Sequence, residues 1–333
     1  MNYNPILIVA GEPNSVFLEI FFKTLKKIRI KRPLILIASN KLVKLQMKKL
    51  NFNRKINVLK NEKQLNLNLN NKSINLIDIN YKTSVAFKNI SSKSNKYIEN
   101  CFKIAFHVLR KHKVKYLITG PISKKTFLNK KYLGITEYIS KHFKVKKSAM
   151  LIYNEKLSVS PLTTHLPLKY VTKNINKNLI IEKVKLLNDF YKKKLKKTPK
   201  IAILGLNPHC ESVDKFNEDE KIVKPTIKYL QKRNYKVFGP FPADTIFLKK
   251  NKNKFNIILG MYHDQVLTPM KALFEYDAIN ITLGLPFIRI SPDHGPNEKM
   301  MGKNISNPLS LIKAISFLDK YWLKQKKVLA KIF

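Results

Sequence analysis

The sequence predicts an α/β fold of two domains, and three observations lead to that prediction. The chain has 333 residues, 44% of them are hydrophobic, and short aliphatic runs alternate with amphipathic stretches. A chain of this length and apolar content buries a core large enough for two domains, or for one large interleaved unit. Alternating strand and helix patterns favour a largely parallel or mixed sheet.

Six aliphatic runs predict the strands. They are PILIVA from residue 5, LILIA from 34, YLIT from 116, AMLIY from 149, IAILGL from 201 and NIILGMY from 256. Apolar residues at helical spacing predict helices at residues 98–109, from about 179 to 195, and from about 308 to 322. Their apolar stripes indicate core packing.

Two segments are less regular. Residues 60–97 are rich in Asn, Lys, Ser and Leu with weak periodicity, which predicts a poorly specified surface segment with one strand pair. The lysine run at 192–197 predicts a solvated helix end.

The formal net charge is +44, which raises the question of a polyanionic partner. Lysine is spread over nearly every segment together with abundant Asn and Ile, and this dispersal favours compositional drift over a nucleic-acid surface. Two cysteines are too few for a disulfide framework, the N-terminus lacks signal-peptide features, and no apolar run approaches the roughly 20 residues that span a bilayer. We therefore expect a soluble, cytoplasmic protein.

Three of the seven histidines stand in unusual motifs that follow predicted strands: His165 in TTHLP, His209 in GLNPHC and His263 in MYHDQ. Each alone is compatible with a hydrogen-bonded loop residue. Together they suit a catalytic site in which three imidazoles hold one divalent ion and leave coordination positions open.

Polar residues near these motifs suit a phosphorylated, hydroxylated amino acid. Asp244 and Asp264 could orient imidazoles, bind an ammonium group or accept a proton. Lys271, Asn280 and Arg289 follow at nearly equal intervals, and Lys with Arg is a typical phosphate-binding pair. Because the chain holds 65 Lys and Arg, only their position in motifs supports this interpretation.

The nine glycines form no GxG pair, so the GxGxxG fingerprint and the Walker A loop are both absent. A Rossmann dehydrogenase and a P-loop kinase are thereby disfavoured. The TGPISK segment from residue 119 is a candidate anion contact between a loop and a helix.

Eight motifs, taken together, resemble the 4-hydroxythreonine-4-phosphate dehydrogenase family over essentially the whole chain. They are GEP, TGPISK, GITEYIS, TTHLPLKYV, LGLNPHC, GPFPADTIF, MYHDQ and NITLGLPFIRISPDHG. The resemblance implies two α/β/α domains with a central cleft, similar to isocitrate and isopropylmalate dehydrogenases, in a homodimer. Residues 1–125 with about 270–333 would form the cofactor side, and about 126–269 the metal and dimer side.

The resemblance also implies the site residues. The metal ligands would be His165 from one subunit and His209 and His263 from the other, with zinc expected first and cobalt or magnesium as alternatives. Substrate contacts would come from Thr136, Lys271, Asn280 and Arg289, and catalytic groups from Asp244, Asp264 and Lys271. NAD or NADP would lie along the segment containing Gly284, Asp293 and His294.

The implied reaction is the NAD(P)-dependent oxidation of 4-phosphohydroxy-L-threonine to 2-amino-3-oxo-4-phosphooxybutanoate. This product decarboxylates to 3-amino-2-oxopropyl phosphate in pyridoxal phosphate (vitamin B6) biosynthesis. Neither a specific nucleic acid nor a membrane is expected as a partner.

Three departures from the family pattern leave alternatives open. Ile135 replaces the family's histidine before Thr136, NSVFLE follows GEP, and CESVDKF follows NPH. A dehydrogenase of the same fold could act on another phosphorylated or four-carbon hydroxy acid, and a folded but slow enzyme is also compatible. A basic nucleic-acid-binding protein is the alternative from a different class.

Overall fold

The computed structural model describes residues 4–60, 69–112, 114–128 and 131–329, with side chains described up to residue 320. The chain divides into two compact units, the first formed by Met1–Ile135 with Pro286–Phe333 and the second by Thr136–Leu285. The expected boundaries lay near residues 125 and 270. The second boundary falls later because the strand at Ile279–Leu283 pairs with the strand at Ala149–Tyr153.

The first unit contains a parallel sheet. Its strands are β1 (Ile6–Val9), β2 (Leu34–Ala38), β3 (Ile56–Val58), β4 (Ile74–Asp78), β5 (Tyr116–Thr119) and β12 (Ile288–Pro292). Their order in the sheet is β3, β4, β2, β1, β5, β12, and each of these neighbouring pairs is parallel. β1, β2 and β5 are buried along their full length, as expected for a parallel sheet covered on both faces.

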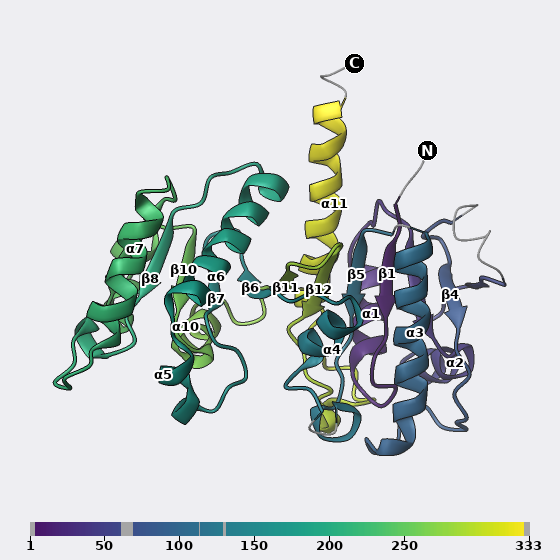
Figure 1. Ribbon diagram of the computed structural model, residues 1–333. Helices are drawn as coiled ribbons and strands as arrows, with labels where there is room; N and C mark the ends of the chain where they lie inside the picture. The colour runs from purple at the N-terminus through teal and green to yellow at the C-terminus, as the bar shows by residue number, and fades with distance from the viewer. Residues whose placement is uncertain (1–3, 61–68, 113, 129–130, 330–333) are drawn as a thin grey trace. The chain divides into compact units, whose positions relative to one another are not determined.

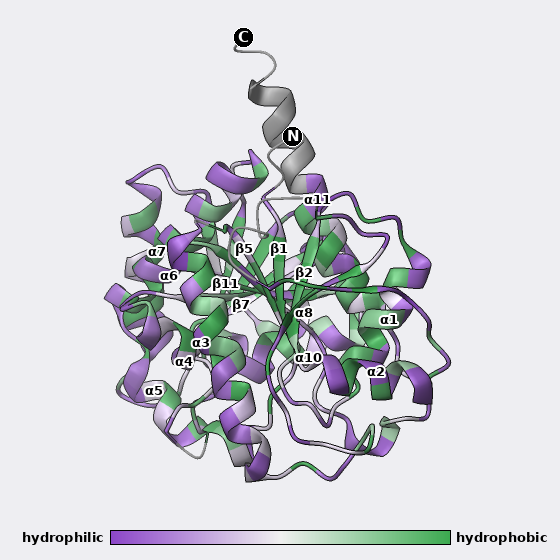
Figure 2. Cartoon of the chain, turned by 90° about the vertical axis from the view of Figure 1, so that its right-hand side faces the viewer, coloured by the Kyte–Doolittle hydropathy of each residue, from purple (hydrophilic) through white to green (hydrophobic). Residues whose placement is uncertain are grey.

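Helices cover this sheet. They are α1 (Phe17–Lys27), α2 (Asn40–Lys49), α3 (Asn95–Lys111) and α11 (Leu309–Leu329), with short turns at Ser92–Ser94, Lys124–Leu128 and Glu298–Met300. α3 contacts β1 and β2, and α1 packs against α2 and α11 (Figure 1). Figure 2 shows α1 and α2 on the other side of the strands from α3, with the strands themselves coloured as hydrophobic.

The second unit has a mixed sheet. Its strands are β6 (Ala149–Tyr153), β7 (Ser158–Pro161), β8 (Ile201–Leu204), β9 (Val237–Phe241), β10 (Ile257–Gly260) and β11 (Ile279–Leu283). Their order is β11, β6, β7, β10, β8, β9. The pairs β11–β6 and β6–β7 are antiparallel, whereas β7, β10, β8 and β9 run parallel to one another.

The helices of the second unit are mostly short. They are α4 (Ile135–His142), α5 (Val171–Asn174), α6 (Lys177–Phe190), α7 (Lys224–Gln231), α8 (Ala243–Ile246), α9 (Lys249–Lys252) and α10 (His263–Phe274), with turns at Leu168–Tyr170, Tyr191–Leu195, Pro208–Cys210 and Asp219–Val223. α6 packs against β6, β11 and α7, and α10 packs against β7 and β10. The α10 contacts complete a core around Val159, Ile258 and Val266.

The expected α/β class and all six predicted strands are confirmed, as β1, β2, β5, β6, β8 and β10. The three predicted helices correspond to α3, α6 with the turn that follows it, and α11, and the lysine run at 192–197 is a largely exposed helix end. The prediction for residues 60–97 was wrong in part. Residues 61–68 lie outside the described residues, but β4 is an inner strand with Ile74 and Leu76 buried. Among the described residues, no helix combines the length and apolarity that a membrane span requires.

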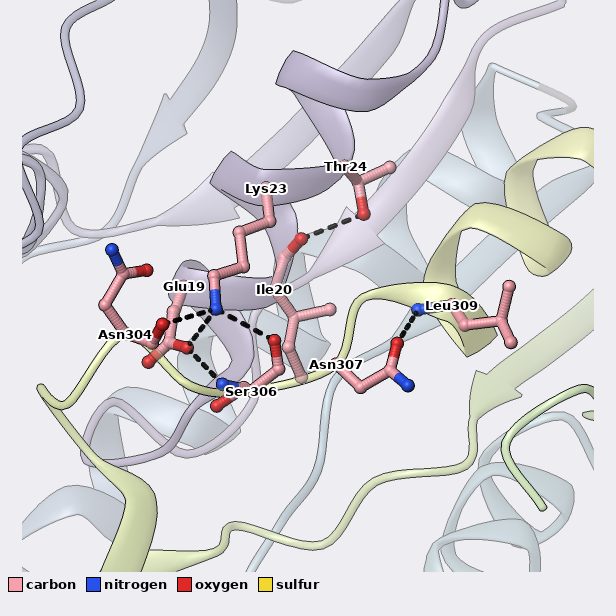
Figure 3. Close-up of polar contacts among 8 residues, drawn as sticks. All are labelled: Glu19, Ile20, Lys23, Thr24, Asn304, Ser306, Asn307 and Leu309. Atoms are coloured by element: carbon pink, nitrogen blue, oxygen red, sulfur yellow. Dashed lines mark hydrogen bonds and ion pairs between the residues drawn. The ribbon is translucent and has the colours of Figure 1, made fainter.

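A polar latch, formed by Glu19, Lys23 and Ser306, holds the segment before α11 against α1 (Figure 3). Lys23 Nζ donates to Glu19 Oε1 at 2.9 Å and to the carbonyl oxygens of Asn304 and Ser306 at 2.8 and 2.9 Å. The Ser306 amide donates to Glu19 Oε1 at 2.6 Å. Because the Glu19 side chain is only 1% exposed, these bonds satisfy Oε1 of a carboxylate that water scarcely reaches, whereas its Oε2 has no hydrogen-bond partner among the described residues.

Candidate functional site

In the second unit, four predicted site residues follow four neighbouring parallel strands. His165 follows β7, His263 follows β10, His209 follows β8, and Asp244 follows β9. The carboxyl ends of parallel strands lie at the same edge of a sheet, which is where α/β proteins place their ligands. The fold therefore places all four residues at one edge of this sheet.

Two of these histidines have unusual backbone conformations. His165 has a φ angle of +43° and His209 one of +54°. Left-handed conformations are uncommon for residues other than glycine, cost about 1–3 kcal/mol and cluster at functional sites. This strain supports a role for both residues beyond loop structure.

His165 and His263 lie against each other within one chain. Their ring centroids are 5.6 Å apart with an interplanar angle of 35°. His263 Nδ1 lies 2.6 Å from Asp264 Oδ1, and His165 Nδ1 lies 4.0 Å from Glu137 Oε1. A carboxylate at Nδ1 fixes the tautomer in which Nε2 can bind a metal or accept a proton.

His209 lies on a separate loop after β8. The Asp219 carboxylate holds this loop by accepting hydrogen bonds from the amides of Leu206 at 2.8 Å and Asn207 at 3.0 Å. Burial and the Asp219 charge raise the pKa of Cys210 to about 11, and the charge of Asp244 contributes in the same direction. Asp244 is thus close enough to the His209 loop to influence its electrostatics.

The described residues of one chain contain no group of three or more His, Cys, Asp or Glu side chains arranged to hold a metal ion. The three histidines that the resemblance assigns to the metal are therefore not assembled within a single chain. Their assembly across two subunits stays a prediction.

Lys271 and Asn280 both belong to the second unit. Lys271 lies on α10, two turns after His263, with its Nζ 5.7 Å from the centroid of the Tyr276 ring. Partial desolvation lowers the pKa of Lys271. Asn280 lies on β11, and its buried Oδ1 accepts no hydrogen bond from any described residue. A buried acceptor without a partner fits a group that binds a polar ligand.

A small cavity of about 60 Å³ lies beside Thr136 in the same unit. Its polar lining consists of Thr136, Glu137, Ser148, Thr164 and Lys183. Sequence reasoning missed Glu137, although its position beside Thr136 in the first turn of a helix was a usable signal. One oxygen of its carboxylate, Oε2, is buried and has no hydrogen-bond partner among the described residues.

The first unit contains a larger pocket of about 770 Å³. Residues 120–125, which follow β5, and residues 294–300, after β12, form most of its lining. The predicted cofactor residue His294 lines it, as do Lys124 and Lys125 of the TGPISK segment. Ile135, the departure from the family pattern, is part of its apolar wall.

Three further residues that were predicted to contact substrate or cofactor make close contacts within their own units. Arg289 is 1% exposed, and its Nε and Nη2 donate to Thr119 Oγ1 at 3.1 and 2.7 Å inside the first unit. The Asp293 amide donates to Ser310 Oγ at 2.7 Å. Gly284 lies in the second unit, where its φ angle is +92° and a β-carbon would meet Lys147 O at 2.2 Å.

Glu12, in the GEP motif after β1, is a second residue that sequence reasoning did not assign to a site. Its amide donates to Pro121 O at 2.8 Å, and Pro121 lines the larger pocket. Burial raises the pKa of its carboxyl group above the ordinary value of 4.5, and the charge of Glu298 adds to this shift.

Comparisons with known proteins agree with the resemblance drawn from the motifs. A sequence model of the pyridoxal phosphate biosynthetic protein PdxA family matches residues 29–318. A 4-hydroxythreonine-4-phosphate dehydrogenase from Sulfurihydrogenibium is 39% identical over 93% of this chain and 96% of its own. A D-threonate 4-phosphate dehydrogenase from Pectobacterium atrosepticum is 32% identical over 67% of this chain and 70% of its own. The crystal structure of the Klebsiella pneumoniae 4-hydroxythreonine-4-phosphate dehydrogenase superposes with a TM-score of 0.81 at 25% identity, covering 96% of this chain and 98% of the other.

Proposed function

The chain belongs to the pyridoxal phosphate biosynthetic protein PdxA family, and we propose that it oxidises 4-phosphohydroxy-L-threonine with a nicotinamide dinucleotide. The observation that carries this proposal is the position of His165, His209, His263 and Asp244 at one sheet edge, in a chain similar over nearly its whole length to dehydrogenases of this substrate.

The proposed reaction converts the substrate's secondary hydroxyl to a ketone. Nicotinamide, when bound, would supply the hydride acceptor. The oxidation product, 2-amino-3-oxo-4-phosphooxybutanoate, is a β-keto acid. It loses carbon dioxide readily because the electrons left by the broken bond are delocalised into the ketone, and 3-amino-2-oxopropyl phosphate results.

The residues present fit a divalent metal site. His165 and His263 are close together, and each has a carboxylate near Nδ1, an arrangement typical of metal-binding histidines. A divalent metal, with zinc as the first candidate, would supply Lewis acidity that lowers the pKa of the substrate hydroxyl. The roles of the histidines are then to bind and orient, with Nε2 of each ring toward the site.

The carboxylates divide between two roles in this proposal. Asp264 is occupied with His263 at 2.6 Å, so it serves to orient the imidazole. Asp244 is exposed after β9, close to the His209 loop, and is the better candidate to accept the hydroxyl proton. Lys271 would bind the substrate phosphate as a compact charge, and the unpartnered Asn280 Oδ1 would accept a hydrogen bond from the substrate.

The 770 Å³ pocket of the first unit is the proposed site for the dinucleotide. Its volume is in the range of small-molecule sites. Its position at the carboxyl ends of β5 and β12 matches where α/β folds bind nucleotides without requiring a GxGxxG loop. His294 and Lys124 lie in its wall, and each could contact the dinucleotide's phosphates or sugars.

The proposal is tested by following NADH or NADPH absorbance with 4-phosphohydroxy-L-threonine, before and after chelation and metal restoration. We expect reduction of the dinucleotide that is lost on chelation and restored by zinc or cobalt. Reduction that survives complete metal removal would contradict the metal site, and absence of turnover with metal bound would contradict the substrate.

D-threonate 4-phosphate is a second substrate to test in the same assay. The relative acting on D-threonate 4-phosphate is 32% identical, and Ile135 replaces a histidine of the family pattern beside Thr136. Such a substrate has a hydroxyl where 4-phosphohydroxy-L-threonine has an amine. A higher kcat/KM for D-threonate 4-phosphate would assign this chain to the second activity.

We also propose that the active form is a homodimer. Val213 and Phe216, on the loop after His209, are strongly exposed, and exposed apolar side chains of this kind are typical of subunit interfaces.

The resemblance implies that His165 comes from one subunit and that His209 and His263 come from the other. The proximity of His165 and His263 instead favours their acting from the same chain, with only His209 supplied by the partner.

Mixing inactive variants distinguishes these divisions. Mixed His165→Ala and His209→Ala chains should regain up to about a quarter of wild-type activity, because half the dimers are then mixed and each carries one intact site. A mixture of His165→Ala with His263→Ala should stay inactive if both residues act from one chain. Recovery in that second mixture would support the division expected from the resemblance.

A further inference from the structure

We propose that Glu137 is a positioning residue for His165 and holds its imidazole so that Nε2 faces the metal. This inference rests on the proposed function, which makes His165 a metal ligand. Neither the motifs nor the comparisons assign a role to Glu137.

The two neighbouring histidines have the same kind of environment. Asp264 approaches Nδ1 of His263, and Glu137 approaches Nδ1 of His165, at 2.6 and 4.0 Å. The two carboxylates reach the pair from different elements, since Asp264 lies on α10 and Glu137 on α4. A pair of rings 5.6 Å apart, each with a carboxylate at the same nitrogen, is the arrangement expected when both Nε2 atoms serve one site.

The surroundings of Glu137 leave its carboxylate available for this role. In a chain with 65 Lys and Arg, Glu137 forms no ion pair with either among the described residues. Lys183 lines the same cavity, but its Nζ donates to Ser148 O and Glu182 Oε1. The Glu137 side chain is 32% exposed, and the His165 ring approaches its Oε1 to 4.0 Å.

The 4.0 Å separation is longer than a hydrogen bond, so the present contact is electrostatic. A metal at Nε2 leaves the proton on Nδ1, and that proton then attracts the carboxylate. The adjoining cavity of about 60 Å³ gives Glu137 space to adjust. Metal binding should therefore draw Glu137 and His165 together.

A purely structural role for Glu137 would affect melting temperature and not metal affinity. An acidic residue in the first turn of α4 also stabilises that helix through its dipole. Losing that effect lowers the melting temperature without changing metal affinity, so the two roles are separated by measuring both.

The experiment titrates Zn²⁺ alone into metal-free, full-length protein, with a chromogenic chelator as competitor. Glu137→Ala should weaken zinc binding about 10–100-fold, as loss of a carboxylate behind a histidine ligand typically does. Glu137→Gln should weaken it less, because its amide oxygen still accepts from Nδ1. Asp264→Asn tests the equivalent contact on His263, and Glu99→Gln, on the exposed face of α3, should leave zinc affinity unchanged.

The outcomes separate this inference from the proposed function. If wild type binds zinc and both Glu137 variants bind it equally tightly, the positioning role is wrong, whatever happens to their melting temperatures. If wild type binds no zinc, the metal site itself is contradicted. Should the alanine variant fail to fold, the glutamine variant alone decides, because zinc affinity equal to wild type would overturn the proposal.

Discussion

The backbone around Gly284 leaves no space for a side chain. It has a φ angle of +92°, and a β-carbon would lie 2.2 Å from the carbonyl oxygen of Lys147. Gly284→Ala should therefore lower the free energy of unfolding by about 1–3 kcal/mol, through backbone strain and displacement of the Lys147 peptide. Urea denaturation followed by circular dichroism measures the loss.

Gly295→Ala is the matched control for that substitution. Gly295 has no left-handed φ, and the nearest atom to its β-carbon would be Asn297 Oδ1 at 3.5 Å. We expect a change in stability within about 0.5 kcal/mol. Equal effects of the two substitutions would show that the close approach at Gly284 is not what requires glycine there.

Glu12 should make stability depend on pH. Its folded-state pKa is raised above 4.5 by burial, so the folded protein prefers the protonated carboxyl group. The corresponding stability is complete at low pH and is lost as pH rises through the folded pKa. Glu12→Gln keeps an acceptor for the Asn14 amide but does not ionise, so the melting temperature of the variant minus that of wild type should become more positive between about pH 4 and 7. A difference that grows toward acid pH would contradict this sign.

At the residue scale, the sequence predicted which strands the three histidines follow but not how the histidines are held. Strand-following motifs located His165, His209 and His263, because chemistry and strand ends are both visible in sequence. Glu137 was not predicted, since its distance to His165 depends on how α4 packs near the loop after β7. The burial of Arg289 beside Thr119 is a tertiary effect of the same kind.

At the element scale, the latch around Lys23 should stabilise the segment that precedes α11. Lys23→Met removes three hydrogen bonds and leaves the buried Glu19 carboxylate with the Ser306 amide as its hydrogen-bond donor among the described residues. We expect a loss of about 2–3 kcal/mol, because an uncompensated buried carboxylate is costly. Amide hydrogen exchange at residues 303–307 should accelerate more than exchange in α6.

An exposed ion pair provides the comparison. Lys103 and Glu99 are 2.8 Å apart on α3, but their side chains are 53% and 41% exposed. Lys103→Met should cost about 0.5 kcal/mol or less, because water and salt screen that pair. A similar loss in both variants would mean that burial of Glu19 is not the source of the latch's stability.

The elements themselves were predictable to different degrees. Strands such as β1 and β8 are continuous aliphatic runs buried on both faces, and this composition is visible in the sequence alone. β4 was not recognised, because its INLID sequence contains the polar Asn75, whose side chain donates to Leu34 O and Asn70 O and accepts from Asn57 Nδ2 in the folded unit. Hydrogen bonds to residues distant in sequence therefore stabilise this strand, and the local sequence pattern does not reveal them.

At the scale of the whole molecule, the charge of +44 has two opposed consequences. Repulsion among the lysines destabilises the folded chain, while the same field attracts anionic substrates and any polyanion. Neither consequence requires a dedicated nucleic-acid surface. The proposed substrate and dinucleotide are both phosphorylated, so this field should speed their encounter at low ionic strength.

Salt distinguishes repulsion from a dedicated nucleic-acid function. Raising NaCl from about 50 to 500 mM shortens the screening length, so the melting temperature should rise by a few degrees as lysine repulsion weakens. A Lys228→Glu, Lys232→Glu variant, altered at two exposed positions of the second unit, should show a smaller rise in melting temperature.

The affinity of the protein for two unrelated DNA duplexes should be equal, and it should fall steeply by about 200 mM salt. Tight binding that persists at that salt with a preference for one sequence would contradict the dispersed-charge interpretation, because base readout needs side chains arranged for it and not a diffuse field.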